Sequence, residues 1–210
     1  MPDYNDNFSS IFPKNGHIVF FDLEYTSWEG SWQRNWSENW EHREVVQIGA
    51  VLVDLDCNFK IVDEFNCYVN PAINNHLSDY FIKLTGIRRD EVKSLGVSFS
   101  NAYSKFLSFV GNSKKIYANG TDGEVLIENC QLCSIESKLE SDKVINFRKW
   151  LAIQVSEYQD KQYESIDSGD IIAVLKNQAS SRNKHNALYD ARCLSEAVKI
   201  LIDRKSIKKN

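Results

Sequence analysis

The sequence predicts an α/β fold in which a mixed central sheet of about five strands is flanked by helices. Two observations lead to this prediction. Short apolar runs bounded by turn signals come first in the chain, which is typical of buried strands. Segments with apolar residues at intervals of three and four follow and alternate with further short runs, which is typical of helices packed on a sheet.

Five segments are expected to be strands. The run from His17 to Glu24 is apolar enough for a central strand that is buried on both faces. A polar turn separates the next two runs, so the first three strands are expected to form a meander. The fourth strand is short and the last one is weaker. The second to fifth strands are expected at residues 45–53, 59–69, 115–118 and 144–147.

Four helices are expected, at residues 99–110, 122–133, 168–176 and 187–202. In the first of them Phe99, Ala102 and Phe106 recur at the spacing of one buried helix face. Cys130 and Cys133 lie one helical turn apart. They fit the second helix better than a zinc site, because no second cysteine pair or histidine lies near them in the sequence.

The 210 residues are read as one globular domain with two short ends, since 42% of them are hydrophobic and 26% are charged. Residues 1–16 lack periodicity and are expected to form a flexible N-terminal arm. Residues 17–203 form the domain, and residues 204–210 are expected to form a solvated basic tail, with a weak phosphate contact as its alternative role.

Composition excludes several classes of protein. Five cysteines at irregular spacings argue against a disulfide framework, and no apolar run is long enough for a membrane span. The polar N-terminus does not resemble a signal peptide, so a cytoplasmic location without membrane contact is expected. The net charge of -4 excludes a protein that binds nucleic acid through overall basicity, but allows an enzyme that meets phosphates through metal ions.

Four carboxylates fall where the fold is expected to bury side chains. Asp22 and Glu24 lie two residues apart on the first strand, so they project from the same face. Asp190 lies on the stripe of the last helix that is expected to pack on the sheet. Two alternatives stay open: Asp22 and Glu24 face water beyond the end of the strand, and Asp122 caps the helix that it begins.

Four carboxylates without a cysteine or histidine cluster favour Mg²⁺ or Mn²⁺. Such a site suits two ions roughly 3.5–4 Å apart that act in phosphodiester hydrolysis. His185 lies five residues before Asp190, and an unperturbed histidine pKa of about 6.5 suits a general base that takes the proton of an attacking water. The other three histidines are expected to lie at the surface.

The order Asp22-x-Glu24, Asp122, His185-x4-Asp190 resembles that of the DEDDh exonucleases, which are relatives of the proofreading subunit of bacterial DNA polymerase and of ribonuclease T. The sequence FDLE at 21–24 is similar to their first motif, and HNALYDA at 185–191 is similar to their third. The segment 68–80, followed by LTGI and DEV, is similar to the branch that trims histone messenger RNA and small RNAs. Bacterial members of that branch include proteins known as sporulation-kinase inhibitors.

The resemblance covers roughly residues 17–203 and implies a ribonuclease H-like fold. It implies 3′-5′ hydrolysis of single-stranded nucleic acid, RNA slightly preferred over DNA, to nucleoside 5′-monophosphates. It also implies that Asp22, Glu24, Asp122 and Asp190 hold two Mg²⁺ or Mn²⁺ and that His185 is the general base. Leu84 and Thr85 fall where the family lines the pocket of the terminal nucleotide. The further expected substrate contacts lie beside the acids: Leu23, Tyr25, Thr26, Trp28 and Asn119.

Four of the five tryptophans recur at every fourth residue from Trp28 to Trp40. One interpretation is an amphipathic helical turn whose indoles pack on the domain or on a second subunit. The other is a surface that stacks on exposed bases. We expect packing for most of these residues and stacking for Trp28, because it is nearest to Glu24.

The alternative to an enzyme is a regulatory module that retains the fold but binds nucleic acid or protein. The presence of all five active-site residues argues against it, because a pure binder does not need them. Among enzymes, an oligonucleotide-scavenging or DNA-trimming hydrolase is the other candidate. The sequence leaves open the choice between RNA and DNA and between monomer and homodimer.

Overall fold

The computed structural model describes residues 11–140 and 142–207, which contain a five-stranded mixed sheet. The strands lie in the order β3-β2-β1-β4-β5. The first three are antiparallel neighbours, whereas β4 and β5 run parallel to β1, so the predicted meander and mixed sheet are confirmed. The bounds are β1 His17–Tyr25, β2 Val45–Asp54, β3 Lys60–Tyr68, β4 Lys115–Ala118 and β5 Val144–Asn146.

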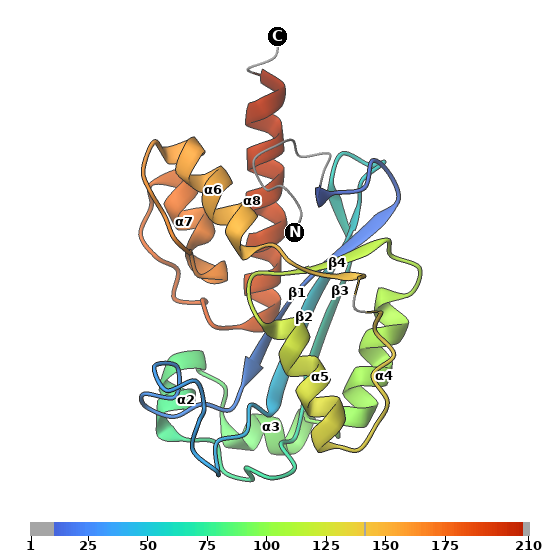
Figure 1. Cartoon of the computed structure of the whole chain (residues 1–210), viewed down its shortest axis with the longest axis vertical. Helices are drawn as coiled ribbons and strands as arrows, with labels where there is room; N and C mark the ends of the chain where they lie inside the picture. Colours follow the sequence, from blue (N-terminus) through green and yellow to red (C-terminus); the bar gives the residue numbers. More distant parts are fainter. Residues whose placement is uncertain (1–10, 141, 208–210) are drawn as a thin grey trace.

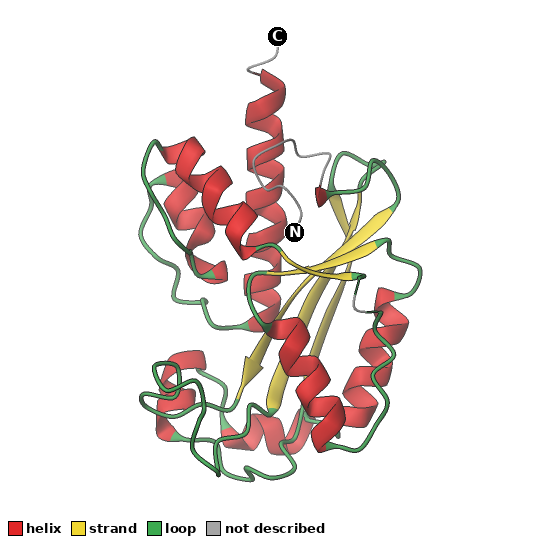
Figure 2. Cartoon of the chain, viewed as in Figure 1, coloured by secondary structure: helices red, strands yellow, loops and turns green. Residues whose placement is uncertain are grey.

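Helices cover both faces of the sheet (Figures 1 and 2). Helix α8 lies along one face with α6 and α7 beside it, α4 and α5 lie on the other face, and α2 and α3 lie near the end of β1. The bounds are α2 Asp79–Thr85, α3 Arg89–Leu95, α4 Phe99–Val110, α5 Asp122–Leu132, α6 Arg148–Gln159, α7 Ile171–Lys176 and α8 Ala187–Ile207, with a 3₁₀ turn, η1 Ser168–Asp170, before α7. In the described part of the chain, no helix has the length and apolar character that a membrane span requires.

The sequence pattern does not predict α2, α3 and α6. Helices α2 and α3 have seven residues each, and each buries a single apolar side chain, Phe81 and Val92. Helix α6 begins without a side-chain cap at Phe147, so the usual start signal is missing. Helices α2 and α3 do carry local caps, because Ser78 accepts a hydrogen bond from the Phe81 nitrogen and Arg88 and Glu91 form a capping box, but both helices are too short to show a helical periodicity.

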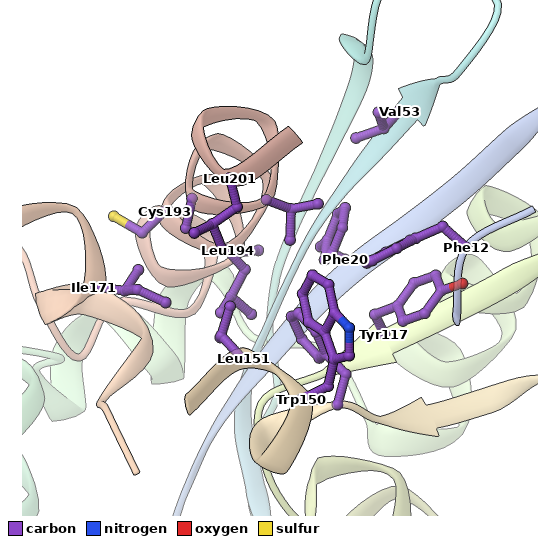
Figure 3. Packing of buried hydrophobic residues seen from close by; sticks show 14 of the residues in the cluster. Phe12, Phe20, Val53, Tyr117, Trp150, Leu151, Ile171, Cys193, Leu194 and Leu201 are labelled. Atoms are coloured by element: carbon purple, nitrogen blue, oxygen red, sulfur yellow. The ribbon is translucent and has the colours of Figure 1, made fainter. Parts of the chain in front are cut away.

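Two cores lie on opposite faces of the sheet because side chains alternate along β1. Phe20 packs in the core under α8, and Phe21 packs in the core under α4 and α5. Figure 3 shows the first core, a buried cluster that contains Phe20, Trp150 and Leu194. A strand that is covered on both faces is a rigid support for the two acids at its end.

The start of α8 is fixed against β2 by two residues of that strand. A Cβ atom at Gly49 would lie 2.0 Å from the backbone nitrogen of Leu188, so only glycine allows this approach. The buried Gln47 side chain accepts a hydrogen bond from the Ala187 nitrogen at 3.0 Å, which satisfies a donor at the helix start. Because Gly49 pairs with Asp22, the first turn of α8 lies beside the acids of β1.

Both predicted domain boundaries need correction within the described residues. Phe12 is 5% exposed and lies 4.6 Å from Tyr117 between ring centroids (Figure 3), so residues 11–16 are anchored to the core and are not a loose arm. Residues 1–10 lie outside the described residues. Helix α8 continues to Ile207, and Arg204 lies over the Tyr158 ring at 4.1 Å, so its charge is held by the protein instead of being free in solvent. The end of the predicted tail, 208–210, is not described.

Candidate active site

The four predicted acids come from the ends of three regular elements. Asp22 and Glu24 lie at the end of β1, Asp122 begins α5, and Asp190 lies in the first turn of α8. Asp122 Oδ1 accepts a hydrogen bond from the Leu23 nitrogen at 3.1 Å. This bond joins the start of α5 to the strand residue between the two acids of β1. The carboxylate of Asp122 therefore lies beside Asp22 and Glu24. A role as a helix cap alone does not explain its bond to the Leu23 nitrogen.

All four acids titrate above their ordinary range. Burial is the largest cause for Asp22 and Glu24, and the charges of the neighbouring acids raise the pKa of both carboxyls further. Burial raises the pKa of Asp122 to about 6, although Arg148 and Arg43 act against it. It raises the pKa of Asp190 to about 7, with further contributions from nearby carboxylates. A cluster of this kind needs compensating positive charge when it is ionised.

Asp190 carries the clearest sign of a ligand. Its carboxylate is buried, and Oδ1 has no hydrogen-bond partner among the described residues. Glu24, His185 and Asp190 each bring one ligand atom within 4.8 Å of the others. A Cβ at Gly169 would lie 2.5 Å from Asp190 Oδ1, so the backbone of η1 approaches this oxygen without covering it with a side chain. An unpartnered buried carboxylate oxygen fits a hard cation.

His185 precedes α8 in a left-handed backbone conformation, with φ of 63°. Its backbone nitrogen donates to Asp190 Oδ2 at 3.2 Å, so the same carboxylate that lacks a partner at Oδ1 fixes the histidine backbone. The preceding residue, Lys184, is held by Asp170 at 3.1 Å. Burial lowers the pKa of the His185 imidazole, which keeps the ring neutral and able to accept a proton near pH 7.

The five predicted catalytic residues line one cavity of about 460 Å³. Among the predicted substrate contacts, those that also line it are Leu23, Tyr25, Trp28, Leu84 and Asn119. Thr26 and Thr85 are not among the lining residues. The Thr26 hydroxyl accepts from the Glu44 nitrogen at 3.0 Å, and the Thr85 hydroxyl donates to the Phe81 carbonyl at 2.9 Å. Both hydroxyls therefore stabilise the backbone.

Several polar residues of the cavity are not predicted from the sequence, and Ser168 and Arg148 are the two with the clearest contacts. Ser168 accepts a hydrogen bond from Asn119 Nδ2 at 3.2 Å, and its own hydroxyl binds Asp22 and lowers the pKa of that carboxyl. Arg148 is the one lysine or arginine among the described residues that line the cavity, and its Nε donates to the Asn119 carbonyl at 3.0 Å. Its backbone nitrogen donates to Asn146 Oδ1 at 3.2 Å, and its other two guanidinium nitrogens form no hydrogen bond with a described residue. The position of Arg148 at the start of α6 has no signature in the sequence.

Residues 28–40, which we call the tryptophan loop, do not form the expected helical turn. Asn35 and Trp36 have φ of 52° and 50°, in the left-handed region that interrupts a right-handed helix. Trp28, Trp32 and Trp36 line the cavity, and Trp40 packs against Trp28 with ring centroids 4.8 Å apart. The regular spacing of the tryptophans therefore does not mark a helix. It places their side chains in a compact loop at the cavity rim.

A family model for exonucleases (RNase_T) matches residues 19–198. The chain belongs to this family. Human 3'-5' exoribonuclease 1 is 31% identical over 142 residues, which are 63% of this chain and 38% of the human protein. The 3'-5' exonuclease eri1 of Schizosaccharomyces pombe is 30% identical over 112 residues, 53% of this chain and 35% of that protein. The chain therefore spans little more than a third of the length of these relatives.

Solved structures confirm the ribonuclease H-like exonuclease fold. The nuclease domain of 3'hExo, a DEDDh family member bound to rAMP, is 25% identical to this chain with a TM-score of 0.72, and the match covers 91% of this chain and 94% of that one. A 3'-exonuclease solved for its recognition of the histone mRNA stem-loop is 25% identical to this chain with a TM-score of 0.73. The match covers 95% of this chain and 67% of that one. These matches confirm the predicted resemblance to DEDDh exonucleases, a group that depends on divalent metal ions.

Proposed function

We propose that this chain is a 3′-5′ exonuclease that removes nucleotides one at a time from single-stranded nucleic acid. The observation that carries the proposal is the meeting of Asp22, Glu24, Asp122, Asp190 and His185 in one cavity, although they lie far apart in the sequence. The shared family and the two 3′-exonuclease structures support the same reaction.

The donor set fits two Mg²⁺ or Mn²⁺. Oxygen ligands are what these hard ions prefer, and the unpartnered Oδ1 of Asp190 provides a lone pair that no described residue uses. We assign the ions to Asp22, Glu24, Asp122 and Asp190. When bound, such ions neutralise charge on a phosphate and lower the pKa of water.

The side chains of this chain divide the remaining work. The neutral His185 ring accepts the proton of the attacking water as the water oxygen bonds to phosphorus and the bond between phosphorus and the 3′ oxygen breaks, and the 3′ oxygen takes up a proton from solvent. Ser168 and Asn119 orient the Asp22 carboxylate. Arg148 offers its free donors to a phosphate oxygen of the strand, where a guanidinium binds phosphate well. The products are a nucleoside 5′-monophosphate and a strand that is one nucleotide shorter with a new 3′ hydroxyl.

The substrate class follows from the relatives. The human relative's name describes an exoribonuclease, and one of the similar structures holds rAMP, which together favour RNA slightly over DNA. Exonuclease I of Escherichia coli, solved with a dT13 oligonucleotide, shares the fold at 14% identity and a TM-score of 0.64. Single-stranded DNA therefore belongs in the substrate panel.

A 5′-labelled RNA and a DNA of the same sequence test this function. With Mg²⁺ or Mn²⁺ we expect a ladder of products shortened from the 3′ end, and with chelator we expect none. Asp190→Asn abolishes the ladder, whereas the matched control Asp203→Asn on the same helix retains it, because the Asp203 side chain is 57% exposed. Cleavage by Asp190→Asn at the rate of the unchanged protein contradicts the assignment.

A further inference from the structure

The tryptophan loop contributes a wall of the active-site cavity that the hydrolytic chemistry does not use. We propose that Trp32 stacks on an unpaired base of the substrate, upstream of the terminal nucleotide. This inference rests on the function proposed above, because the base belongs to the strand whose 3′ end enters the cavity.

Trp32 is 58% exposed although its side chain is large and apolar. It lines the same cavity as Glu24 and His185. Tyr80 and Leu84 of α2 line this cavity as well and are 39% and 38% exposed. Large apolar groups gathered in this way at the mouth of a cavity are typical of a ligand-binding surface, whereas scattered ones are not.

Neighbouring rings hold Trp32 in place. It meets the ring of Trp36 at 5.6 Å with an interplanar angle of 87°, so neither ring is stacked flat on the other. Trp36 in turn donates from Nε1 to the Thr26 carbonyl at 3.0 Å and lies 5.5 Å from Tyr25 of β1. The Arg43 guanidinium lies 5.7 Å from the Trp36 ring. Trp32 is thus supported through Trp36 by the same strand that carries the acids.

One buried carboxylate fixes the rest of the tryptophan loop. Glu41 is 5% exposed, accepts from the Ser31 hydroxyl at 2.6 Å and accepts from Arg34 Nε at 2.9 Å. The Trp36 nitrogen also donates to the Ser31 carbonyl at 3.0 Å. These bonds order the loop before substrate arrives, so binding a base costs little further conformational entropy.

The position of Trp32 at the rim determines which base it meets. The acids at the floor must hold the scissile phosphate, and Leu23 beside them is only 4% exposed. A strand that enters the cavity passes the rim before its last nucleotide reaches the floor, so the exposed Trp32 meets an upstream base. Every base has a π-face, so stacking tolerates any sequence but requires an unpaired base.

Binding of a labelled single-stranded 12-mer tests the proposal by fluorescence anisotropy in a His185→Ala background with Mg²⁺, where cleavage is slow. We expect Trp32→Ala to weaken binding about 5- to 100-fold, which is the range for loss of one stacked base. Leu95→Ala is the control, since Leu95 is a 61% exposed apolar side chain of α3 that is absent from the cavity lining. It is expected to bind within about twofold of the parent, and Trp32→Phe is expected to retain most of the affinity.

A second probe separates stacking from damage to the fold. In this 12-mer, abasic residues replace the three nucleotides that precede an intact terminal nucleotide. The protein with Trp32 is expected to lose affinity for the abasic strand, whereas Trp32→Ala is expected to bind both strands equally. Equal loss in both proteins, or an unchanged affinity of Trp32→Ala for the normal strand, overturns the stacking proposal. A complete absence of cleavage by the unchanged protein overturns the proposed function instead, and the binding comparison still decides the role of Trp32.

Discussion

The floor and the rim of the active-site cavity are built in different ways. The floor takes its acids from the ends of β1, α5 and α8, so it is as rigid as the sheet and helices behind it. The rim is the tryptophan loop, which has no regular element and is held by its own side chains around Glu41. On the proposed function, we expect floor residues to determine whether hydrolysis occurs and rim residues to determine how tightly a strand is held.

The largest expected effect comes from breaking the floor. Asp190→Asn removes a charge from the carboxylate whose Oδ1 lacks a partner, so we expect activity to fall by a factor of about 1,000 or more. Thermal stability without metal is expected to stay the same or rise, because burial and like charges disfavour the ionised carboxylate. Steady-state kinetics and thermal unfolding in chelator check both statements. A large loss of stability would instead indicate a structural role.

A smaller effect is expected where the cavity meets the phosphates. Arg148→Ala removes the one lysine or arginine among the described residues that line the cavity, so we expect KM for a single-stranded 12-mer to rise about tenfold. Arg148→Lys is expected to recover part of this loss, since it keeps the charge but not the planar group. The KM of Lys149→Ala, on the neighbouring residue that does not line the cavity, serves as the comparison. An unchanged KM for Arg148→Ala contradicts the phosphate contact.

The floor was more predictable from the sequence than the rim. Acids that interrupt an apolar strand or a buried helix stripe stand out, so the sequence alone predicts Asp22, Glu24 and Asp190 as site residues. Arg148 resembles any of the 25 lysines and arginines until α6 places it at the cavity. The spacing of the tryptophans predicts a helix, but the left-handed backbone at Asn35 depends on tertiary contacts that a periodicity does not contain.

The tryptophan loop at the rim can be disordered by a substitution that leaves every tryptophan in place. Glu41→Ala removes the acceptor of both Ser31 and Arg34, so the tryptophan loop is expected to become mobile. We expect KM for the 12-mer to rise about fivefold with little change in kcat, because the acids of the floor are not displaced. The control is Glu38→Ala in the same loop, because the Glu38 side chain forms no hydrogen bond with another described residue. A fall in kcat as large as that of Asp190→Asn would show that floor and rim are not separate.

The smallest effect is a pH dependence of stability that belongs to the floor alone. The folded pKa values of Asp122 and Asp190, about 6 and about 7, lie above the ordinary value of 3.8, so the folded protein binds more protons than the unfolded chain between pH 4 and 7. Stability in chelator is therefore expected to fall as pH rises through this window, and the raised pKa values of Asp22 and Glu24 act in the same direction.

Thermal unfolding in chelator at pH 5.5 and pH 8 measures this dependence, with an expected decrease in Tm of about 4 °C or more at the higher pH. Excess Mg²⁺ at pH 8 is expected to reverse the decrease, because the ionised acids then gain opposite charge. Asp190→Asn flattens the dependence, whereas Glu41→Ala at the rim leaves it in place, since hydrogen bonds from Arg34 and Ser31 lower the pKa of Glu41 and outweigh the opposite effect of burial. A Tm that rises with pH in chelator would mean that the floor acids are not held close together in solution.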